Sequence, residues 1–348
     1  MLLGRVASSE DEDTDFLSKF VSMTFRSSFL PIVLAVIFVL PSCGRKERSS
    51  DSRTKGEVVS VRKMPSPPKT PSMVTDPSED QEYVIAHFWD AFLDGSYQCD
   101  SNHINGVVFS EAEEAFAMYA ALLGAAPFDF SRKEVGTLFS KVEKFESSNP
   151  SSNVFGFFEK MTSKYLYDPN SPTRDEDLYC QYVKRLASSK FVPEEMRPAY
   201  SNDARLCSMN AKGTKAADIS FTDREGRRRN LHRIKAEHTL LFFTNPGCPA
   251  CREIIQQLTE NPRIDDLVAK GVLAVVNLYI DLDREEWKEY SKKYPSSWIN
   301  GYDQSYTIRT DETYSVRAIP SLYILDADKR VVMKDAPVEK VLAYLEKL

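Results

Sequence analysis

The sequence lacks several features that would assign it to a common class of protein. Its four histidines, His87, His103, His232 and His238, form no pair at the spacing of metal ligands. Its net charge of −6 argues against a dedicated nucleic-acid binder, for which a basic domain is expected. Its apolar run at Phe29–Leu40 is too short to span a bilayer comfortably. What the sequence does supply is length and apolar content, 348 residues and 42%, which are sufficient for two domain cores.

Cysteine is also scarce, and one pair alone lies at short spacing. Cys248, Pro249, Ala250 and Cys251 form a Cys-x-x-Cys motif. The remaining cysteines are single and scattered: Cys43, Cys99, Cys180 and Cys207. A structural zinc site would need a second pair of Cys or His ligands at similar spacing, and the sequence contains none. The motif therefore favours dithiol redox chemistry, with a zinc half-site and a purely structural disulfide as the alternatives.

The segments on either side of the motif favour the same chemistry. The apolar run Thr239–Thr244 predicts a strand that ends before Cys248, and Arg252–Leu258 predicts a helix that follows it. Unpaired N–H groups and the positive end of the helix dipole favour a thiolate over a thiol at this position. Pro249 suits a first helical turn, because its missing N–H would have no partner there.

A proline lies at the start of a later predicted strand. Ala318, Ile319 and Pro320 precede the β-rich run Ser321–Leu325, and the first residue of a strand is a permitted position for proline in a sheet. Taken alone, Pro320 is expected to be an ordinary trans proline, because cis bonds are a small minority of X-Pro bonds. The cysteine motif and this proline together are, however, a more specific signal than either feature alone.

Over residues 210–348 these features resemble the thioredoxin-like superfamily, and especially its membrane-anchored extracytoplasmic thiol-disulfide oxidoreductases. The resemblance implies that Cys248 is the nucleophile, that Cys251 resolves the mixed disulfide and that Pro320 is the cis-proline beside them. It also implies that Ile319 offers its backbone to a substrate peptide. Cys248 and Cys251 are thus the predicted catalytic residues, and Ile319 and Pro320 the predicted substrate-binding residues.

The sequence departs from thioredoxin proper at several of its motif positions. Asn245, Pro246 and Gly247 stand in place of the usual tryptophan segment, and Phe242 stands where thioredoxin carries a buried aspartate. Loss of that proton acceptor argues against the cytosolic reductant role. A thiol peroxidase of the peroxiredoxin type would need Thr or Ser three residues before its cysteine, where this sequence has Asn245.

The amino-terminal region predicts export and lipidation. Arg26 precedes Phe29–Leu40, which has the length of a signal-peptide core. Leu40–Gly44 resembles a bacterial lipobox, which implies diacylation of Cys43 and cleavage after Ser42. An uncleaved anchor or ordinary secretion is the alternative to lipidation.

The segments that flank this signal differ from it in composition. Residues 1–22 are acidic and polar, unlike the start of a signal peptide, so they are predicted to be a non-native extension. Residues 23–42 then form the lipoprotein signal peptide. Residues 43–80 are rich in Ser, Pro, Lys and Arg and poor in aromatics, which predicts a disordered tether.

Residues 81–205 predict an all-α domain. Tyr83, His87, Phe88 and Phe92 recur at helical spacing and suggest one buried face. Ser110 with Glu113 and Ser131 with Glu134 resemble capping boxes at helix starts. The predicted helices are 111–123, 132–145, 154–166 and 176–187, and aromatics such as Trp89 and Phe157 are expected in the core.

This helical segment, with Phe88, Trp89 and Asp90, resembles the domain of unknown function that precedes thioredoxin-like domains in some Gram-negative lipoproteins. The combined resemblance covers residues 81–348. It implies an architecture more than a biochemical activity, because that family has no established substrate.

Residues 206–348 predict a mixed sheet flanked by helices, preceded by a hairpin over 219–222 and 228–231. Predicted strands are 239–244, 272–280, 321–325 and 330–334; predicted helices are 249–260, 284–293, 305–314 and 337–347. Trp298–Tyr302 is expected to be a loop, either at the rim of the active site or simply packed. Asp281 and Asp283 are interpreted as a solvated strand end in preference to a metal pair.

The sequence as a whole predicts a multidomain protein, with an amino-terminal all-α domain and a carboxy-terminal α/β thioredoxin-like domain. The expected activity is that of a lipid-anchored, periplasm-facing thiol-disulfide oxidoreductase that needs no cofactor or metal. Its expected partners are client protein disulfides or thiols, a membrane thiol electron donor or acceptor, and the membrane through the lipid on Cys43, but no nucleic acid. The alternative is a binding or assembly module with a structural disulfide. Cys99, Cys180 and Cys207 are expected to form either one disulfide plus a buried thiol or three buried thiols.

Overall fold

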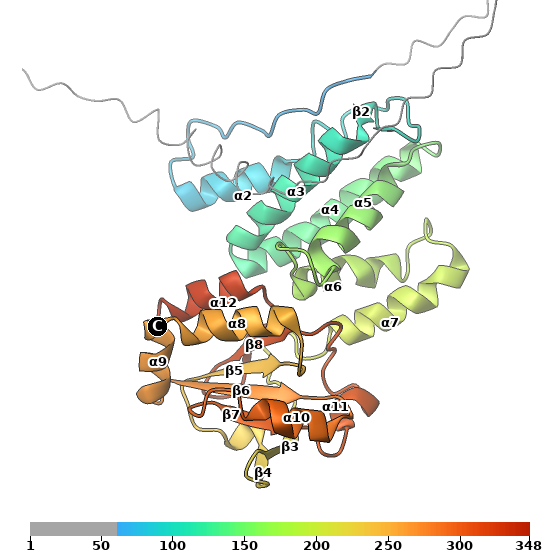
Figure 1. The fold of residues 1–348 in the computed structure, drawn as a ribbon. Helices are drawn as coiled ribbons and strands as arrows, with labels where there is room; N and C mark the ends of the chain where they lie inside the picture. The colour runs from blue at the N-terminus through green and yellow to red at the C-terminus, as the bar shows by residue number, and fades with distance from the viewer. Residues whose placement is uncertain (1–60) are drawn as a thin grey trace, which may run out of the picture. The chain divides into compact units, whose positions relative to one another are not determined.

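The computed structural model describes residues 61–348 (Figure 1). The predictions for residues 1–22, residues 23–42 and the lipidation site Cys43 fall outside the described residues, as does the tether over 43–60. Among residues 61–348, no helix combines the length and the apolar content that crossing a membrane requires.

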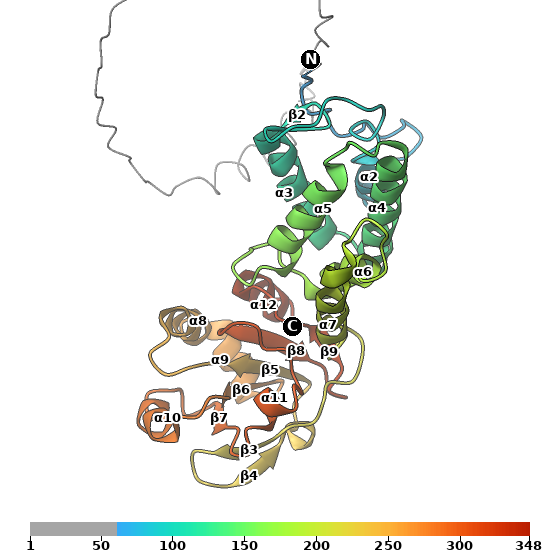
Figure 2. The ribbon, with the colours of Figure 1, turned by 90° about the vertical axis from the view of Figure 1, so that its right-hand side faces the viewer.

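The amino-terminal half of the described chain is helical, as predicted, and Figures 1 and 2 show α3, α4 and α5 side by side. In chain order the elements are α2 (Pro77–His87), β1 (His103–Ile104), β2 (Val107–Val108), α3 (Phe109–Ala125), α4 (Phe128–Ser148), α5 (Val154–Thr162), a π-helical turn (Ser163–Tyr167), α6 (Glu176–Leu186), a 3₁₀ turn (Glu194–Met196) and α7 (Arg197–Cys207).

Aromatic side chains fill the core of this helical domain. Trp89 is 2% exposed, and its ring meets the ring of Phe158 edge to face, with 4.8 Å between the centroids. Contacts of this geometry add about 0.5–1.5 kcal/mol beyond the burial of area. Phe157 is also buried, so the prediction that Trp89 and Phe157 belong to the core is confirmed.

The predicted capping boxes are wrong, because both helices begin earlier than expected. The N-cap residue of α3 is Val108 and that of α4 is Pro127, and neither makes a side-chain capping bond. Ser131 therefore lies within α4, where its hydroxyl donates to the carbonyl of Leu123 at 2.8 Å. Its partner in the predicted box, Glu134, is buried.

Two further features of the helical domain differ from the prediction. His87 is exposed and pairs with Asp90 at 2.7 Å, so it does not join Phe88 and Phe92 on the buried face. Helix α7 was not predicted, because Cys207 is its single buried residue and it carries little apolar periodicity.

The end of the predicted tether contacts the helical domain. The guanidinium of Arg62 lies over the ring of Tyr97, with 3.9 Å to the centroid, and donates to the carbonyls of Ala91, Phe92 and Asn105. The amide of Met64 donates to the Glu111 carboxylate at 3.0 Å. Residues 62–64 are therefore placed by contacts that the composition of this segment did not predict.

The carboxy-terminal half forms one seven-stranded mixed sheet, with strands in the order β4-β3-β7-β6-β5-β8-β9. Its elements are β3 (Ser220–Asp223), β4 (Arg228–Asn230), a 3₁₀ turn (Leu231–Arg233), β5 (His238–Phe243), α8 (Pro249–Thr259), α9 (Pro262–Ala269), β6 (Leu273–Tyr279), α10 (Arg284–Ser291), β7 (Ile299–Tyr302), α11 (Thr307–Thr310), β8 (Ser321–Leu325), β9 (Val331–Met333) and α12 (Val338–Leu345). The predicted fold class of two domains, one all-α and one α/β with a mixed sheet, is confirmed.

Side chains along the central strand β5 point alternately to the two faces of the sheet and belong to a separate core on each face. Leu240 and Phe242 point to one face, where they pack with α8, α9 and α12. Leu241 and Phe243 point to the opposite face and pack with α11 and the β3–β4 hairpin. This two-sided burial is expected of a central strand. Strand β5 ends at Phe243, and residues 244–247 connect it to the cysteine motif.

Residues 299–302, predicted as part of a loop, form the strand β7. This strand pairs with β6 in parallel and with β3 in antiparallel register. Its sequence includes Asn300 and Gly301, which weaken any strand signal. The glycine is required by packing, because a Cβ at position 301 would lie 2.4 Å from the ring of Phe221.

The two aspartates after β6 have structural partners. Asp281 accepts a hydrogen bond from the Arg309 guanidinium at 3.0 Å, and Asp283 caps α10 by accepting from the amide of Glu286. Helix α9, which precedes β6, was not predicted, because only Ile264 and Leu267 of its residues are buried.

Candidate active site

The cysteine motif lies at the junction between a central strand and a helix. Strand β5 ends at Phe243, and Cys248 is the N-cap residue of α8, which begins at Pro249. Cys248 and Cys251 form a disulfide, with 5.3 Å between their Cα atoms. The turn before them contains Gly247 at φ +72°, a conformation that favours glycine.

The two sulfurs differ in accessibility. Cys248 is half-buried, whereas Cys251 is 1% exposed and belongs to the core cluster beneath α8. A thiol or thiolate from another protein therefore has access to the sulfur of Cys248 in preference to that of Cys251. This asymmetry is the geometry that a nucleophile and a resolving cysteine require.

The start of α8 favours negative charge on Cys248. The amide of Cys251 donates to the Cys248 sulfur at 3.1 Å, so one of the otherwise unpaired N–H groups of the first helical turn points at that sulfur. The positive end of the helix dipole acts in the same direction. After reduction of the disulfide, these two influences stabilise a thiolate at Cys248.

The residue that replaces the acid of thioredoxin is fully buried. Phe242 is 0% exposed and packs in the same cluster as Cys251. Thr244, the residue after β5, donates to Asn277, whose amide donates to Asn300 at 3.0 Å. On β5 the position of the thioredoxin aspartate is thus occupied by an apolar side chain.

Pro320 lies at the adjacent strand end. The Ile319–Pro320 peptide bond is cis, and Ser321 at the start of β8 pairs with Phe243 at the end of β5. Ile319 and Cys248 also pack against the same core cluster. The topology thus brings the two predicted substrate-binding residues to the same sheet end as the cysteine motif, and their roles stay predictions.

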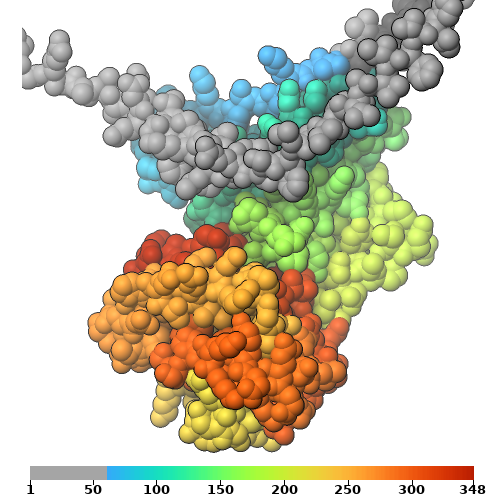
Figure 3. Space-filling model, viewed as in Figure 1, coloured from blue at the N-terminus to red at the C-terminus, as the bar shows by residue number. Residues whose placement is uncertain are grey.

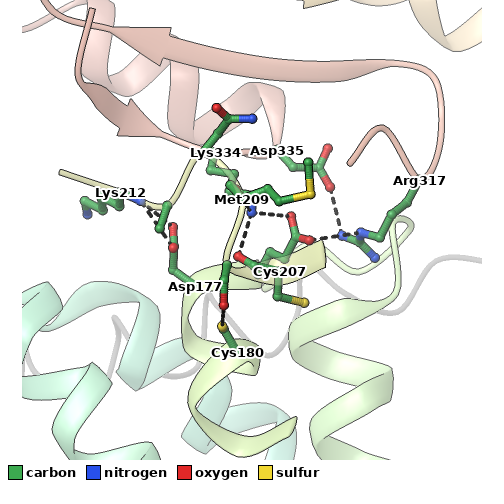
Figure 4. Close-up of polar contacts among 12 residues, drawn as sticks. Asp177, Cys180, Cys207, Met209, Lys212, Arg317, Lys334 and Asp335 are labelled. Atoms are coloured by element: carbon green, nitrogen blue, oxygen red, sulfur yellow. Dashed lines mark hydrogen bonds and ion pairs between the residues drawn. The ribbon is translucent and has the colours of Figure 1, made fainter. Parts of the chain in front are cut away.

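Arg317, three residues before Pro320, was not singled out from the sequence. Its guanidinium donates to the Asp335 carboxylate at 2.8 Å (Figure 4). It also donates to the carbonyl of Tyr167 and lies 4.0 Å from the centroid of the Tyr167 ring. Asp335 also accepts a hydrogen bond from the Ser321 hydroxyl at 2.8 Å. Residues on both sides of Pro320 are therefore held by Asp335, and one of them is held by the helical domain as well.

A buried ion pair continues this contact between the two domains. The side chains of Glu176 and Lys334 are 0% and 1% exposed, and they pair at 3.3 Å. Arg317 lies 3.9 Å from the same carboxylate. Burial raises the pKa of the Glu176 carboxyl although two cations lie beside it. Figure 3 shows the helical domain, in green, directly against the orange and red C-terminal domain.

The other described cysteines form no disulfide. Cys180 and Cys207 are buried, and Cys99 is half-buried. Burial raises the pKa of the Cys207 thiol well above its usual range, since desolvation penalises the thiolate. The observed state, two buried thiols and one half-buried thiol, differs from both predicted arrangements.

Fold and site together define a two-domain protein whose carboxy-terminal domain has the thioredoxin fold with a paired-cysteine centre. Residues 42–210 match a domain of unknown function (DUF5106), and residues 237–331 match the thioredoxin-like family. A crystal structure of a thioredoxin-like protein from Bacteroides caccae is 30% identical, with a TM-score of 0.70, over 81% of this chain and 98% of that one. The chain belongs to the thioredoxin-like family, which confirms the predicted superfamily and the predicted domain of unknown function ahead of it.

Curated relatives match part of the chain, between 30% and 39% of its length. The thiol-disulfide oxidoreductase ResA of Bacillus cereus is 27% identical over 39% of this chain and 78% of its own length. Mouse nucleoredoxin is 25% identical over 30% of this chain, and the match spans about a quarter (24%) of nucleoredoxin. The similarity to ResA supports an oxidoreductase of the thiol-disulfide class.

Proposed function

We propose that this protein is a lipid-anchored, periplasm-facing thiol-disulfide oxidoreductase that acts on client proteins through Cys248 and Cys251. The observation that carries the proposal is the placement of the pair. The accessible sulfur caps the start of α8 and accepts an amide hydrogen bond, while the second sulfur is buried beside it. The similarity to an oxidoreductase supports the same activity.

In the proposed reaction, the Cys248 thiolate attacks one sulfur of a client disulfide. A bond forms between the two sulfurs, the client disulfide breaks, and the other client sulfur leaves as a thiolate that takes up a proton. Cys251 then loses its proton and attacks the Cys248 sulfur, which releases the second client thiolate. Two electrons pass to the client, and the enzyme is left with the Cys248–Cys251 disulfide.

The next cycle requires a dithiol reductant, for which we propose a thiol carrier of the membrane. All of these steps are reversible, so the same pair can oxidise a client dithiol when its partner is the stronger oxidant. The potential of the Cys248–Cys251 pair relative to its partners therefore sets the direction of electron flow.

Ile319 and Pro320 are proposed to hold the client. The backbone of Ile319 precedes β8, whose first residue lies opposite the end of β5. An extended client segment that pairs with this backbone would place its sulfur beside Cys248. Binding through main-chain hydrogen bonds accommodates different client sequences.

Lipidation of Cys43 is proposed from the lipobox-like segment Leu40–Gly44 and the apolar run before it. An acyl anchor on the outer side of a membrane would place the dithiol where client disulfides form and persist. The residues between Cys43 and the helical domain would set the distance from that membrane.

Reduction of insulin by dithiothreitol tests the activity. We expect the wild-type protein to accelerate insulin precipitation and both Cys248→Ser and Cys251→Ser to abolish the acceleration. Cys99→Ser is the matched control, because this half-buried cysteine lies in the helical domain, and it should keep full activity. Equal activity in all four proteins would contradict the proposal and favour the binding or assembly module.

A further inference from the structure

The helical domain contains an open groove of about 960 Å³. Its walls come from α5, the π-helical turn, α6 and α7, and the residues that matter here are Gly156, Ser163, Tyr167, Tyr179, Tyr200 and Arg317. Gly156 and Ser163 on its rim are exposed, so the groove opens at the surface. Its volume is at the upper end of the range for ligand sites, and its open form suits a chain that enters and leaves more than an enclosed small molecule.

One end of this groove is formed by a residue that lies close in sequence to Pro320. Arg317 lines the groove and is the only one of these lining residues that belongs to the thioredoxin-like domain. It lies three residues before Pro320, and three residues of extended chain span at most about 11 Å. A client segment that pairs with the backbone of Ile319 therefore needs only a few more residues to reach the groove.

Aromatic rings line the groove next to that end. Tyr167 stacks on Tyr179, with 4.1 Å between ring centroids and 14° between ring planes. The guanidinium of Arg317 covers Tyr167, so that a cation and two rings form one stack. Tyr167 is the last residue of a π-helical turn, an irregularity that is frequent at functional sites. The lining also includes the charged residues Glu159, Lys160, Lys164 and Asp168, so the groove offers charged groups and the edges of aromatic rings to an extended polypeptide.

Gly156, one of the lining residues, agrees with an open surface at this place. It lies inside α5, where glycine costs about 1 kcal/mol relative to alanine. A Cβ at this position would meet no atom within 4 Å, and its φ is not positive, so neither packing nor backbone geometry requires glycine there. A groove that admits another chain needs open space at this position, which would explain a glycine there.

We propose that this groove binds the segment of a client polypeptide that flanks the cysteine attacked by Cys248. The proposal rests on the proposed oxidoreductase function and assigns client binding to the helical domain. The thioredoxin-like domain supplies the chemistry, and Arg317 joins the groove to the loop that contains Pro320.

The test compares a polypeptide disulfide with a small disulfide. The full chain in detergent is reduced, freed of reductant and mixed with insulin or with bis(2-hydroxyethyl) disulfide, and the rate constant for oxidation of its thiols is measured by acid quenching and alkylation. Gly156→Trp fills the groove from inside α5, and Gly156→Ala is the matched control. Ser163→Trp blocks the groove from a second position, with Ser163→Ala as its control.

We expect both tryptophan variants to lower the rate constant with insulin at least tenfold and to change that with bis(2-hydroxyethyl) disulfide less than twofold. Both alanine variants should match the wild type with both disulfides. Equal rates in tryptophan and wild-type proteins, an equal loss with both disulfides, or a wild type that reacts with the small disulfide but not with insulin would overturn the groove proposal. A wild type that reacts with neither disulfide would instead refute the oxidoreductase function.

Discussion

Substitution of Lys334, the buried lysine between the two domains, tests how much this contact stabilises the protein. The ammonium of Lys334 donates to the carbonyls of Cys207 and Met209, at 2.8 and 2.6 Å (Figure 4). It also pairs with Glu176. Lys334→Met keeps the length of the side chain but removes its charge and its donors. The Glu176 carboxylate would then keep only Arg317, at 3.9 Å.

The expected loss of stability for Lys334→Met is about 3–5 kcal/mol, because removing one member of a buried pair leaves an uncompensated charge. The double variant Glu176→Leu with Lys334→Met removes both charges and should recover at least about 2 kcal/mol of that loss. Lys329→Met is the matched control. Lys329 is also buried. Among the described residues, its ammonium donates a hydrogen bond only to the Thr239 hydroxyl. Lys329→Met should therefore lower the free energy of unfolding by about 1 kcal/mol.

Urea unfolding of the oxidised protein measures these differences. Tryptophan fluorescence reports on both domains, since Trp89 lies in the helical domain and Trp298 beside the dithiol core. The same midpoint by fluorescence and by circular dichroism would justify two-state values. If Lys334→Met costs no more than Lys329→Met, or if the two substitutions of the double variant simply add, the interdomain ion pair does not stabilise the protein as described.

Three further predictions concern other parts of the chain. Burial raises the pKa of Glu134 to about 7, so stability should fall as pH rises from 4.5 to 7; Glu134→Gln should remove this fall and gain about 1–2 kcal/mol at pH 8, measured by urea unfolding. In the reduced protein at pH 7, iodoacetamide should modify Cys248 within minutes but Cys180 and Cys207 only after unfolding, and equal rates by mass spectrometry would contradict the helix-start argument. Mass spectrometry of protein from native membranes should find an acylated amino terminus at Cys43, and an unmodified terminus elsewhere would refute lipidation.

Much of the fold could be predicted because its signals are local. The run Thr239–Thr244 gave β5 to within one residue, since a strand buried on both faces is apolar throughout. Strand β7 could not be found in this way, because Gly301 is selected by its contact with Phe221, a residue far away in the sequence. Helix α7 was missed because its exposed surface carries no periodic apolar pattern.

The same distinction applies to the site. Cys248 and Cys251 are three residues apart and Pro320 directly precedes a recognisable strand, so local sequence indicates all three. Arg317 stands just before that proline, but its partner Tyr167 is separated from it by 150 positions, and no local pattern links them. The contact between the helical domain and the segment before Pro320 can therefore be seen only in the folded structure.

Trapping of the mixed disulfide tests the central claim most directly. In the Cys251→Ser variant, Cys248 can still attack a client disulfide, but the resolving thiol is absent, so the covalent intermediate should persist. We expect non-reducing electrophoresis of native cell envelopes to show adducts of this variant that dithiothreitol releases and that mass spectrometry maps to Cys248. A Cys251→Ser protein that forms no such adducts, either in cells or with model disulfides, would contradict the account.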